Sequence, residues 1–402
     1  MNKHDILING GGLAGLTCAI ALAHAEFNVG VIAPKPKHAP TKTGDSKSPP
    51  KAGDRRTTAL LSQSIEYLKE LGVWESIAPH AASLQIMRII DATNRLIRAP
   101  QVDFRASEID LESFGENVTN FDLLNALEEA AKSYDAITLY DDFSKNIEIF
   151  EDHVAVQTEN GTELQGNFLI GADGRNSPVR DAANITTRQW KYPQMAVVVN
   201  LEHTLPHGNV STEFHTETGP FTLVPMPGDA SSLVWVEKPE KAQELAALSA
   251  EELGLIVEKQ MQSILGKIKI IGKTQTFPLS GMIAERFGDG RVALIGEAAH
   301  VIPPIGAQGF NLGIRDIQSL AKLLQATPKS EWHMIGKTYH SSRLKDVNLR
   351  ATSIDLLNRS LLSDFLPSQL VRGLGLFTLG NAGPLRRMIM REGVGIKRGK
   401  RS

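Results

Sequence analysis

The N-terminal part of the chain alternates between short apolar runs and one longer run. Asp5 to Asn9 has three apolar residues between polar ends, and Val29 to Ala33 is a second short apolar run. Between them, Leu13 to His24 is long enough for a helix and follows a glycine-rich segment. Short apolar runs predict buried strands, and the longer run predicts a helix. The order strand, helix, strand therefore predicts the start of a β-α-β unit.

Further elements are predicted up to residue 170. Apolar residues near helical spacing predict a helix over 58–71, which Gly72 would end, and another over 121–131, capped by Asn120. Strand-like runs lie at 84–91, 95–99, 147–150, 154–158 and 163–170. The last three predict a small antiparallel meander with a hairpin turn at Asn160 and Gly161. Pro34 to Gly53 has almost no large apolar residues, which predicts a mobile surface loop.

The pattern becomes mostly strand-like between Met195 and Pro278. Its strand-like runs are 196–201, 221–224, 233–236 and 268–276, and one helix is predicted over about 250–265. An apolar strand at 291–295 and a helix at 312–324 then restore the earlier alternation. We therefore predict an α/β fold, in which a mostly antiparallel β-sheet domain is inserted into a Rossmann-like domain and a helical segment follows at the C-terminus.

The predicted domain boundaries follow from these changes of pattern. The discontinuous Rossmann-like domain would comprise residues 1–80, 100–185 and 286–345. The inserted substrate domain would comprise residues 81–99 and 186–285, and residues 346–402 would form a C-terminal helical region with a basic tail. Such a discontinuity would bring together motifs that lie far apart in the sequence.

Three glycine-centred segments carry the first functional signal: GGGLAG at 10–15, GADG at 171–174 and GEAAH at 296–300. The first lies between a predicted strand and a predicted helix, which is the context of a dinucleotide site. There Gly10 permits the tight turn, Gly12 lets backbone approach a pyrophosphate, and Gly15 lets the helix pack closely on the strand. The free N–H groups at the helix start, at Leu13 and Ala14, would meet the phosphate charge. Together the three segments predict an FAD site.

Composition and charge narrow the other possibilities. The 402 residues suggest two or three domains, and 42% hydrophobic residues are enough for sizeable cores. A formal net charge of -2, spread along the chain, predicts no nucleic-acid partner. The single cysteine, Cys18, excludes an intrachain disulfide and a cysteine-clustered metal site, and it fits a reducing compartment. Because no leader segment and no apolar run of ~18 residues is evident, we expect a cytoplasmic protein.

The longer motifs around these glycines carry a resemblance to a known family. In order along nearly the whole chain stand GGGLAG, DRRTTAL at 54–60, GADGRNSPVR at 171–180 and GEAAHVIPPIGAQGFNLGIRD at 296–316. With them the chain resembles the FAD-dependent aromatic-ring monooxygenases that have the p-hydroxybenzoate hydroxylase fold, and most of all the ubiquinone-biosynthesis hydroxylases. The resemblance implies FAD as cofactor, NAD(P)H as the reductant, molecular oxygen as co-substrate, and ring hydroxylation through a flavin hydroperoxide.

The same resemblance implies roles for residues in three of the motifs. Arg56 would contact the phosphates or the ribityl chain of FAD. Asp173 and Gly174 would lie near the ribityl chain, where the reductant approaches. In the last motif, Gly296 opens the segment, and the carboxylate of Glu297 would approach the ribityl chain.

The loop from Pro303 to Asn311 would lie against the isoalloxazine ring. N–H groups of Phe310 and Asn311 would be donated to the pyrimidine edge of the flavin, where they would stabilise negative charge that develops during the reaction. The predicted contact residues of this loop are Pro304, Gly306, Gly309, Phe310 and Asn311. We expect an apolar wall opposite the ring, from 221–226 and 233–236, to keep water out.

Two positions depart from the family pattern. The second predicted strand ends in Ala33, followed by Pro34, where the family commonly has an acidic residue that binds the adenosine ribose. Glu297 stands where aspartate is commoner. These departures motivate a hypothesis of a different class, a catalytically silent flavoprotein-like accessory subunit of a biosynthetic complex. We assign no catalytic residue and no metal site, and His300 is interpreted as a structural residue of its loop.

The C-terminal region bears on the substrate. Apolar residues from Val347 to Phe365 fall on one face of a predicted helix. Leu385 to Ser402 then holds one acid, Glu392, and the basic residues Arg386, Arg387, Arg391, Lys397, Arg398, Lys400 and Arg401. Apolar surface beside basic charge suits an anionic membrane surface, and equally a helix packed on the FAD domain with a solvated tail.

The first of these alternatives favours a polyprenylated phenol of ubiquinone biosynthesis as the substrate. It also implies peripheral contact with the inner face of a membrane, or with other ubiquinone-biosynthesis proteins. The second alternative allows a hydroxylase of a small soluble phenol, which needs no membrane contact.

Overall fold

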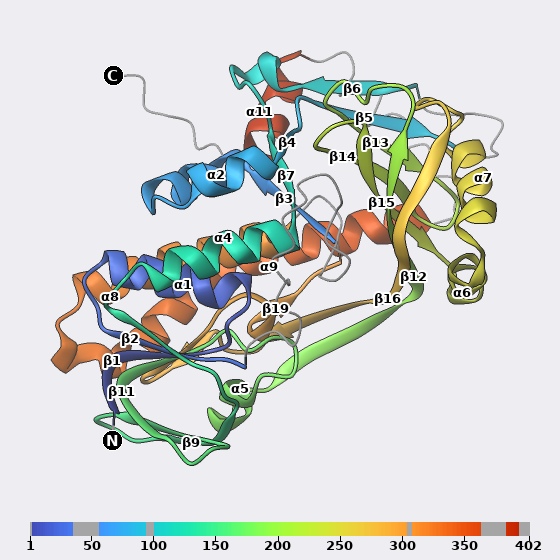
Figure 1. Cartoon of the computed structure of the whole chain (residues 1–402). Coiled ribbons are helices and arrows are strands. Elements are labelled where there is room, and N and C mark those ends of the chain that lie inside the picture. The colour runs from blue at the N-terminus through green and yellow to red at the C-terminus, as the bar shows by residue number, and fades with distance from the viewer. Residues whose placement is uncertain (1, 35–55, 94–99, 304–307, 363–382, 394–402) are drawn as a thin grey trace.

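The computed structural model describes residues 2–34, 56–93, 100–303, 308–362 and 383–393. Two large sheets lie in different parts of the molecule, one among helices at the lower left of Figure 1 and the other at the upper right. Two long strands, β12 (Thr187–His203) and β16 (Ile268–Ala284), run from the second sheet down to the first domain. The predicted α/β fold with an inserted, mostly antiparallel sheet is confirmed.

The first sheet has the parallel core of a dinucleotide fold. Its strands follow the order β17-β18-β11-β1-β2-β8, and every pair from β18 to β8 is parallel. Their bounds are β1 (Asn2–Asn9), β2 (Val29–Ile32), β8 (Ile137–Tyr140), β11 (Glu163–Gly171), β17 (Gly288–Asp289) and β18 (Val292–Leu294). Helices α1 (Leu13–His24), α4 (Asn120–Lys132) and α8 (Gln308–Ala326) pack together over this sheet. The predicted start of a β-α-β unit is therefore confirmed.

The predicted meander is also present. Strands β9 (Ser144–Ile149) and β10 (Val154–Thr158) pair antiparallel, and β10 pairs with β11. In the turn between β10 and β11, Gly161 has a φ of 83°, a left-handed conformation that glycine adopts without steric strain. The chain then passes from β11 into α5 (Pro178–Ala182).

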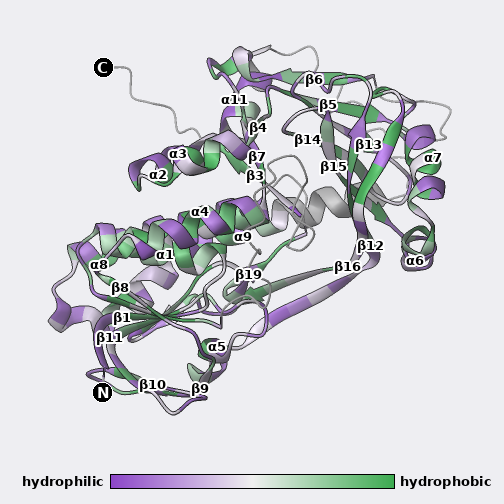
Figure 2. Cartoon of the chain, viewed as in Figure 1, coloured by the Kyte–Doolittle hydropathy of each residue, from purple (hydrophilic) through white to green (hydrophobic). Residues whose placement is uncertain are grey.

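The second sheet has the order β19-β16-β12-β15-β14-β13-β5-β6, in which only the β13–β5 pair is parallel. Its other strands are β5 (Ile86–Asp91), β6 (Val102–Arg105), β13 (Val210–His215), β14 (Pro220–Met226), β15 (Ala230–Glu237) and β19 (His300–Val301). Helices α6 (Pro239–Ala247) and α7 (Ala250–Gln260) cover its outer face, over a core that includes Phe221 and Trp235. The stretch of β12 between the two domains is hydrophilic (Figure 2).

The helix predicted over 58–71 is wrong in its first part. Residues Thr57–Leu61 form β3, which pairs with β7 (Gly115–Thr119), and β7 also pairs with β4 (Ala82–Ser83). The helix α2 begins only at Ser62 and ends at Glu70. Pairing with a distant strand thus overrides the local spacing of apolar residues.

The predicted cap of α4 is wrong by one residue. The N-cap is Thr119, whose Oγ1 accepts a hydrogen bond from the Asp122 N–H over 3.1 Å, and Asn120 is already helical. The helix predicted over 250–265 ends at Gln260, and α6 and β13 had no predicted counterpart. The strand predicted over 95–99 and most of the predicted loop over 34–53 lie outside the described residues.

The remaining elements include a long C-terminal helix. Helix α9 (Ile335–Leu362) crosses the boundary that we predicted at 345, and its Val347 and Ala351 are buried in the core of the first domain. Strand β6, which we assigned to the segment 100–185, belongs to the second sheet. The other short elements are α3 (Trp74–Ile77), η1 (Ala78–His80), η2 (Ala106–Ile109), η3 (Gly296–Ala298), η4 (Lys329–Met334) and α11 (Gly383–Gly393).

Candidate functional site

The GGGLAG segment forms the turn from β1 into α1. Gly10 has a φ of 117°, and a Cβ there would lie 2.2 Å from the carbonyl oxygen of Ala172. At Gly15, a Cβ would lie 1.9 Å from the carbonyl oxygen of Gly10. At Gly12, the N-cap before Leu13, a Cβ would meet nothing within 4 Å. Gly10 and Gly15 are therefore required for packing, whereas Gly12 leaves open space at the start of α1.

The GADG segment lies beside this turn, at the end of β11. Asn9 Nδ2 donates to Oδ2 of Asp173 over 2.9 Å, and the Val179 N–H donates to the same oxygen over 3.1 Å. Burial raises the pKa of the Asp173 carboxyl, and its hydrogen bonds partly oppose this effect. Gly174 has a φ of 79°, and a Cβ there would meet nothing within 4 Å. Asp173 is thus fixed by β1 and α5, while Gly174 leaves open space next to it.

The GEAAH segment joins the first domain to the second sheet. At its start, a Cβ on Gly296 would lie 3.2 Å from the Cβ of Ala14 in α1. Glu297 is exposed in the following turn. At the end of the segment, His300 and Val301 form β19, which pairs with β16. One short segment therefore borders both the start of α1 and the second sheet.

A group of buried polar and charged side chains holds both ends of GEAAH in place. His300 Nε2 lies 2.6 Å from Oδ2 of Asp316, and each of these side chains is 1% exposed. The same oxygen accepts the Gly296 N–H over 3.1 Å, and Oδ1 accepts Nε of Arg343 over 2.8 Å. Arg343 also donates from Nη1 to Asp346 over 2.8 Å. Burial lowers the pKa of Arg343, but the two carboxylates raise it more, so the net shift is upward.

The ionic contacts continue from Asp346 to the first turn of α8. Arg350 donates from Nε to Asp346 over 3.0 Å and from Nη1 to Gln308 over 3.0 Å. The interpretation of His300 as a structural residue agrees with this geometry. Its acidic partner, Asp316, closes the quoted motif, whereas no sequence signal marks Arg343 as the third member.

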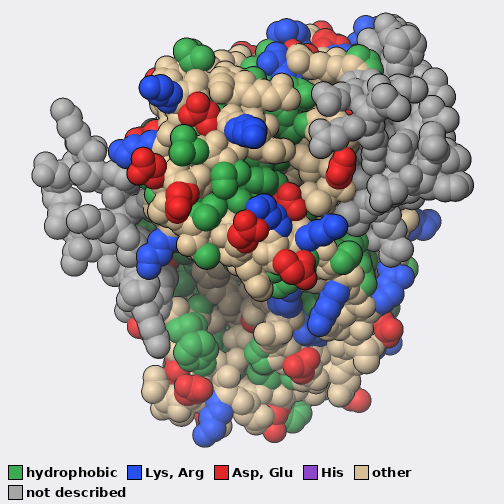
Figure 3. All heavy atoms as spheres, turned by 90° about the vertical axis from the view of Figure 1, so that its right-hand side faces the viewer, with side chains coloured by type: hydrophobic (Ala, Val, Ile, Leu, Met, Phe, Trp, Pro, Cys, Tyr) green, Lys and Arg blue, Asp and Glu red, His purple; other side chains and the backbone are tan. Residues whose placement is uncertain are grey.

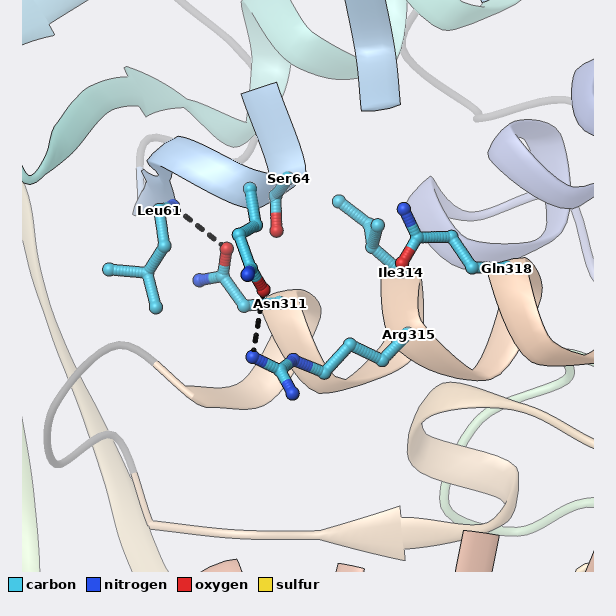
Figure 4. A pocket seen from close by; sticks show the side chains of 7 residues that line it. Leu61, Ser64, Asn311, Ile314, Arg315 and Gln318 are labelled. Carbon is cyan, nitrogen blue, oxygen red and sulfur yellow. Dashed lines mark hydrogen bonds between the residues drawn. The ribbon is translucent and has the colours of Figure 1, made fainter. Parts of the chain in front are cut away.

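Asn311 connects α8 to β3. Its Oδ1 accepts the Leu61 N–H over 2.8 Å (Figure 4), and its Nδ2 donates to the carbonyl oxygen of Ala59 over 2.8 Å. The cavity beside it, between α2 and α8, measures about 10 Å³ and is too small for a cofactor. Phe310 is half-buried against the first core, and a Cβ on Gly309 would meet nothing within 4 Å. The predicted contacts Pro304 and Gly306 lie outside the described residues.

Two arginines link separate parts of the site. The guanidinium carbon of Arg56 lies 5.1 Å from the ring centroid of Phe277 in β16, so this side chain reaches from the first domain to the second sheet. Arg180 is buried, and it donates to the carbonyl oxygens of Ala298 over 3.1 Å and Arg175 over 3.0 Å. Sequence reasoning did not single out Arg180, although it closes the quoted motif GADGRNSPVR.

The predicted apolar wall is divided between the two faces of the second sheet. Phe221, Leu223 and Leu233 lie in the core beneath α6 and α7. Val234 and Val236, which alternate with them along β15, belong to a separate apolar cluster with Ala196, Val198, Tyr192 and Leu279. Only the second set lies on the face that Arg56 reaches at Phe277.

These features fit FAD. Two of the three glycine segments meet at the carboxyl ends of β1 and β11, and the third follows β18 at the same edge. There the start of α1 has no acidic residue in its first turn and borders open positions at Gly12 and Gly174, which suits a pyrophosphate. At the end of β2, Ala33 offers no carboxylate to a ribose. The acidic residues of the segment that follows, Asp45 and Asp54, are alternative candidates for that contact, and they lie outside the described residues.

Comparison with known proteins agrees with this geometry. Ubiquinone hydroxylase UbiL of Rhodospirillum rubrum is 31% identical over 396 residues, which cover 97% of this chain and 89% of that protein. The 3-demethoxyubiquinol 3-hydroxylase of Escherichia coli is 29% identical, with 98% of each chain covered. Klebsiella pneumoniae HpxO, solved with FAD and uric acid, has the same fold, with a TM-score of 0.76 at 18% identity over 98% of this chain and 96% of that chain.

One family match covers most of the chain. Residues 3–350 match the family described as FAD binding domain. This match spans all three glycine segments, both sheets and the first part of α9. The chain therefore belongs to the FAD binding domain family, and its cofactor is FAD.

Proposed function

We propose that this protein is a monooxygenase that hydroxylates the ring of a polyprenylated phenol in ubiquinone biosynthesis, with NAD(P)H as the reductant. The observation that carries the proposal is the position of GEAAH, which borders the start of α1 at Gly296 and enters the second sheet at His300. A cofactor at the glycine segments would therefore lie next to a sheet that can hold a ring. The ubiquinone-ring substrate is supported by the two relatives, which match nearly the whole chain.

The roles of individual residues form part of this proposal. N–H groups from Gly12 to Ala14 bind the pyrophosphate, and Gly174 and Glu297 lie along the ribityl chain. Residues Gly309 to Asn311 face the isoalloxazine ring, and the side chain of Asn311 fixes the start of α8 through β3. When bound, FAD takes electrons from the reductant and activates oxygen for transfer to the ring. The cluster around Val198 and Val234 excludes water from the ring side of the site.

The first test is the visible absorption spectrum of the purified protein before and after excess FAD, with the released cofactor identified by chromatography. Near-stoichiometric FAD supports the proposal. The holoenzyme is then given 2-prenylphenol, NADH or NADPH, and oxygen, and the product is analysed for one added oxygen atom. A protein that binds no flavin after reconstitution would instead favour the silent accessory subunit.

Peripheral membrane contact is the finer part of the proposal. Within the described residues, no helix combines the length and apolar character needed to cross a bilayer. Charges of both signs are interspersed with apolar side chains on the face around α6 and α7, so that face offers no patch of one charge (Figure 3). We therefore assign the contact to the C-terminal region, where basic residues follow Arg386.

The structure already places two of those basic residues on the fold. Arg386 forms a two-pronged ion pair with Glu108, at 2.6 and 2.8 Å, and Arg391 contacts Asp110 over 3.0 Å. Arg387 and the basic residues after 393 would supply the membrane contact. Flotation with anionic vesicles, comparing the full chain with a chain ending at Thr378, tests this assignment. Equal flotation of the two would contradict it and favour a small soluble phenol as substrate.

A further inference from the structure

A histidine and a glutamate stand together on β13 of the second sheet. His215 Nε2 lies 2.8 Å from Oε1 of Glu213, two residues earlier on the same face of the strand. The other oxygen of Glu213 accepts Oγ1 of Thr222, in the neighbouring β14, over 3.4 Å. The His215 side chain is 7% exposed and that of Glu213 27%. The pair is thus nearly buried yet reaches open space on one side.

The pair lies on the face of the sheet that looks toward the first domain. The alternate residues Phe214, Phe221 and Trp235 lie in the core beneath α6 and α7, so their neighbours along each strand point the other way. The registers pair His215 with Pro220, and Ala196 with both Val236 and Phe277. Extended by one residue, the register of β14 and β15 sets Pro220 opposite Val236, so all five residues fall in one row. Arg56 of the first domain contacts Phe277 in that row.

A second contact joins the first domain to the second sheet, whose inner face carries His215. Asn117 in β7 donates from Nδ2 to the carbonyl oxygen of Pro225 in β14 over 2.7 Å. The apolar cluster of Val198 and Val234 lies on this same face. A ring held against that cluster therefore has His215 and Glu213 as polar neighbours.

The contact with Glu213 decides which nitrogen of His215 can accept a proton. A carboxylate accepts hydrogen bonds, so it fixes the proton of the neutral imidazole on Nε2 and leaves the lone pair on Nδ1. Within the described chain, Nδ1 of His215 has no hydrogen-bond partner. It therefore offers an acceptor to an O–H group in the site.

The other charged groups near His215 are less suited to accept a proton from an O–H group in the site. Asp91 is the register partner of His215 on β5. Its Oδ1 accepts hydrogen bonds from Oγ1 of Thr93 over 2.6 Å and from the Thr93 N–H over 3.1 Å. Glu217 is exposed in the adjoining turn, and Arg56 reaches the face at Phe277, on a strand far from β13. No group of three or more histidine, cysteine and acidic side chains in the described residues has the arrangement of a metal site.

We propose that His215 is the catalytic residue that binds the phenolic hydroxyl of the ring, and that Glu213 is the positioning residue that holds it. This inference rests on the proposed function. The O–H bond of the phenol breaks, its proton passes to Nδ1, and the electron pair stays on the phenol oxygen. The ring becomes more electron-rich, which favours its attack on the activated oxygen. The carboxylate of Glu213 stabilises the imidazolium that forms.

The test compares the full-length holoenzyme with the variants His215→Asn and Glu213→Gln. With 2-prenylphenol as the probe, His215→Asn should lower kcat by about 10²- to 10⁴-fold, the usual effect of removing a general base. KM should rise by no more than about 12-fold, which corresponds to the loss of one hydrogen bond. It should also remove the acid limb of the pH profile of kcat/KM. Glu213→Gln keeps a hydrogen-bond acceptor but no charge, so its acid limb should move to lower pH.

A matched control is His203→Asn, because His203 is equally buried in the same sheet but binds the Leu205 carbonyl and Ser231 instead. This variant should keep the wild-type rate per bound flavin. In the oxidised wild type, 2-prenylphenol should also bind roughly 2- to 12-fold more tightly than its methyl ether, which matches the net free energy of one hydrogen bond.

The outcomes separate the two proposals. A wild-type enzyme that hydroxylates no phenol contradicts the proposed function, and the phenol and methyl ether affinities still test His215. An active His215→Asn variant with an unchanged pH profile overturns the role of His215. If the His215→Asn variant does not fold, two other results would overturn the role of His215. One is an acid limb of the pH profile at the same pH in Glu213→Gln as in the wild type. The other is equal affinity for 2-prenylphenol and its methyl ether.

Discussion

Replacing Asp316 by asparagine should destabilise the protein through the buried charges behind GEAAH. The carboxylate accepts three donors: His300 Nε2 at 2.6 Å, the Gly296 N–H at 3.1 Å and Arg343 Nε at 2.8 Å. An asparagine has one acceptor and one donor group, so in either orientation its NH2 faces a donor. His300 can change tautomer to accept that NH2, but Gly296 and Arg343 cannot. The variant therefore leaves at least one buried donor unpaired.

The expected loss follows from burial and from the remaining partner. Removing one member of a buried ion pair costs about 3–5 kcal/mol. Asp316 is 1% exposed, but Arg343 keeps Asp346, at 2.8 Å from its Nη1. We therefore expect the lower end of that range, about 3 kcal/mol, for Asp316→Asn. Gly296 loses its anchor as well, so FAD should also bind more weakly.

Urea unfolding of the apoprotein, followed by far-ultraviolet circular dichroism, measures the stability, and a flavin fluorescence titration measures FAD affinity. Asp346→Asn is the matched control. Its side chain is 28% exposed, so its loss should be about 1 kcal/mol or less. Equal losses in the two variants, or unchanged FAD affinity in Asp316→Asn, would refute the reasoning.

Three further predictions concern the glycine turn, the start of α8 and helix α11. Gly12→Ala should keep the stability of the apoprotein, because its Cβ would enter open space, but it should weaken FAD binding, because we place the pyrophosphate in that space. Gly15→Ala should destabilise the apoprotein by roughly 1–3 kcal/mol, because its Cβ would meet the Gly10 carbonyl oxygen at 1.9 Å. Thermal unfolding with and without FAD separates the two variants, and equal behaviour would contradict the prediction. Asn311→Asp should cost about 1–3 kcal/mol, because it turns an acceptor toward the Ala59 carbonyl oxygen, and urea unfolding checks this against Asn311→Ser. The pKa of Glu108 is lowered chiefly by its hydrogen bond from Arg386, so this pair stabilises α11 above the ordinary carboxyl value of 4.5 and is lost as pH falls through the lowered value. Hydrogen exchange of residues 383–393, corrected for the intrinsic rate, should therefore stay slow at pH 7 and rise only below about pH 4.5, and Glu108→Gln should show the fast rate at both values.

The sequence predicted best those elements that local patterns determine. The bounds of α1 agree with the prediction, because a glycine turn precedes the helix and its residues are nearly all buried against the sheet. The same holds for the meander, whose turn depends on the left-handed conformation of Gly161. By contrast, β3 is a strand only because β7, more than fifty residues later, pairs with it. No pattern within 58–71 contains that information.

The candidate site divides in the same way. The glycines were found because their spacing reflects a backbone requirement within a few residues, as at Gly10 and Gly15. The connection of Asn311 to β3 and that of Asp316 to Arg343 join distant segments through side chains that many surface positions also carry. No sequence pattern indicated His215, because the alternation of residues along a strand separates its two faces but does not say which face lies toward the first domain. The structure identifies the inner face of the second sheet, because α6 and α7 cover the opposite face.

The second sheet and GEAAH, which we propose contacts FAD, are joined at β19. His300 pairs with Ile283 through its backbone and with Asp316 through its side chain, and Asp316 in turn holds the N–H of Gly296. A rotation of the second sheet that keeps this pairing must therefore move either the buried charges or the start of GEAAH. Because the charges lie in a close-packed core, the least costly arrangement is one in which sheet and segment keep a fixed relation. A ring that binds on the sheet, as we propose, would then be held at a defined position relative to the flavin, as oxygen transfer between them requires.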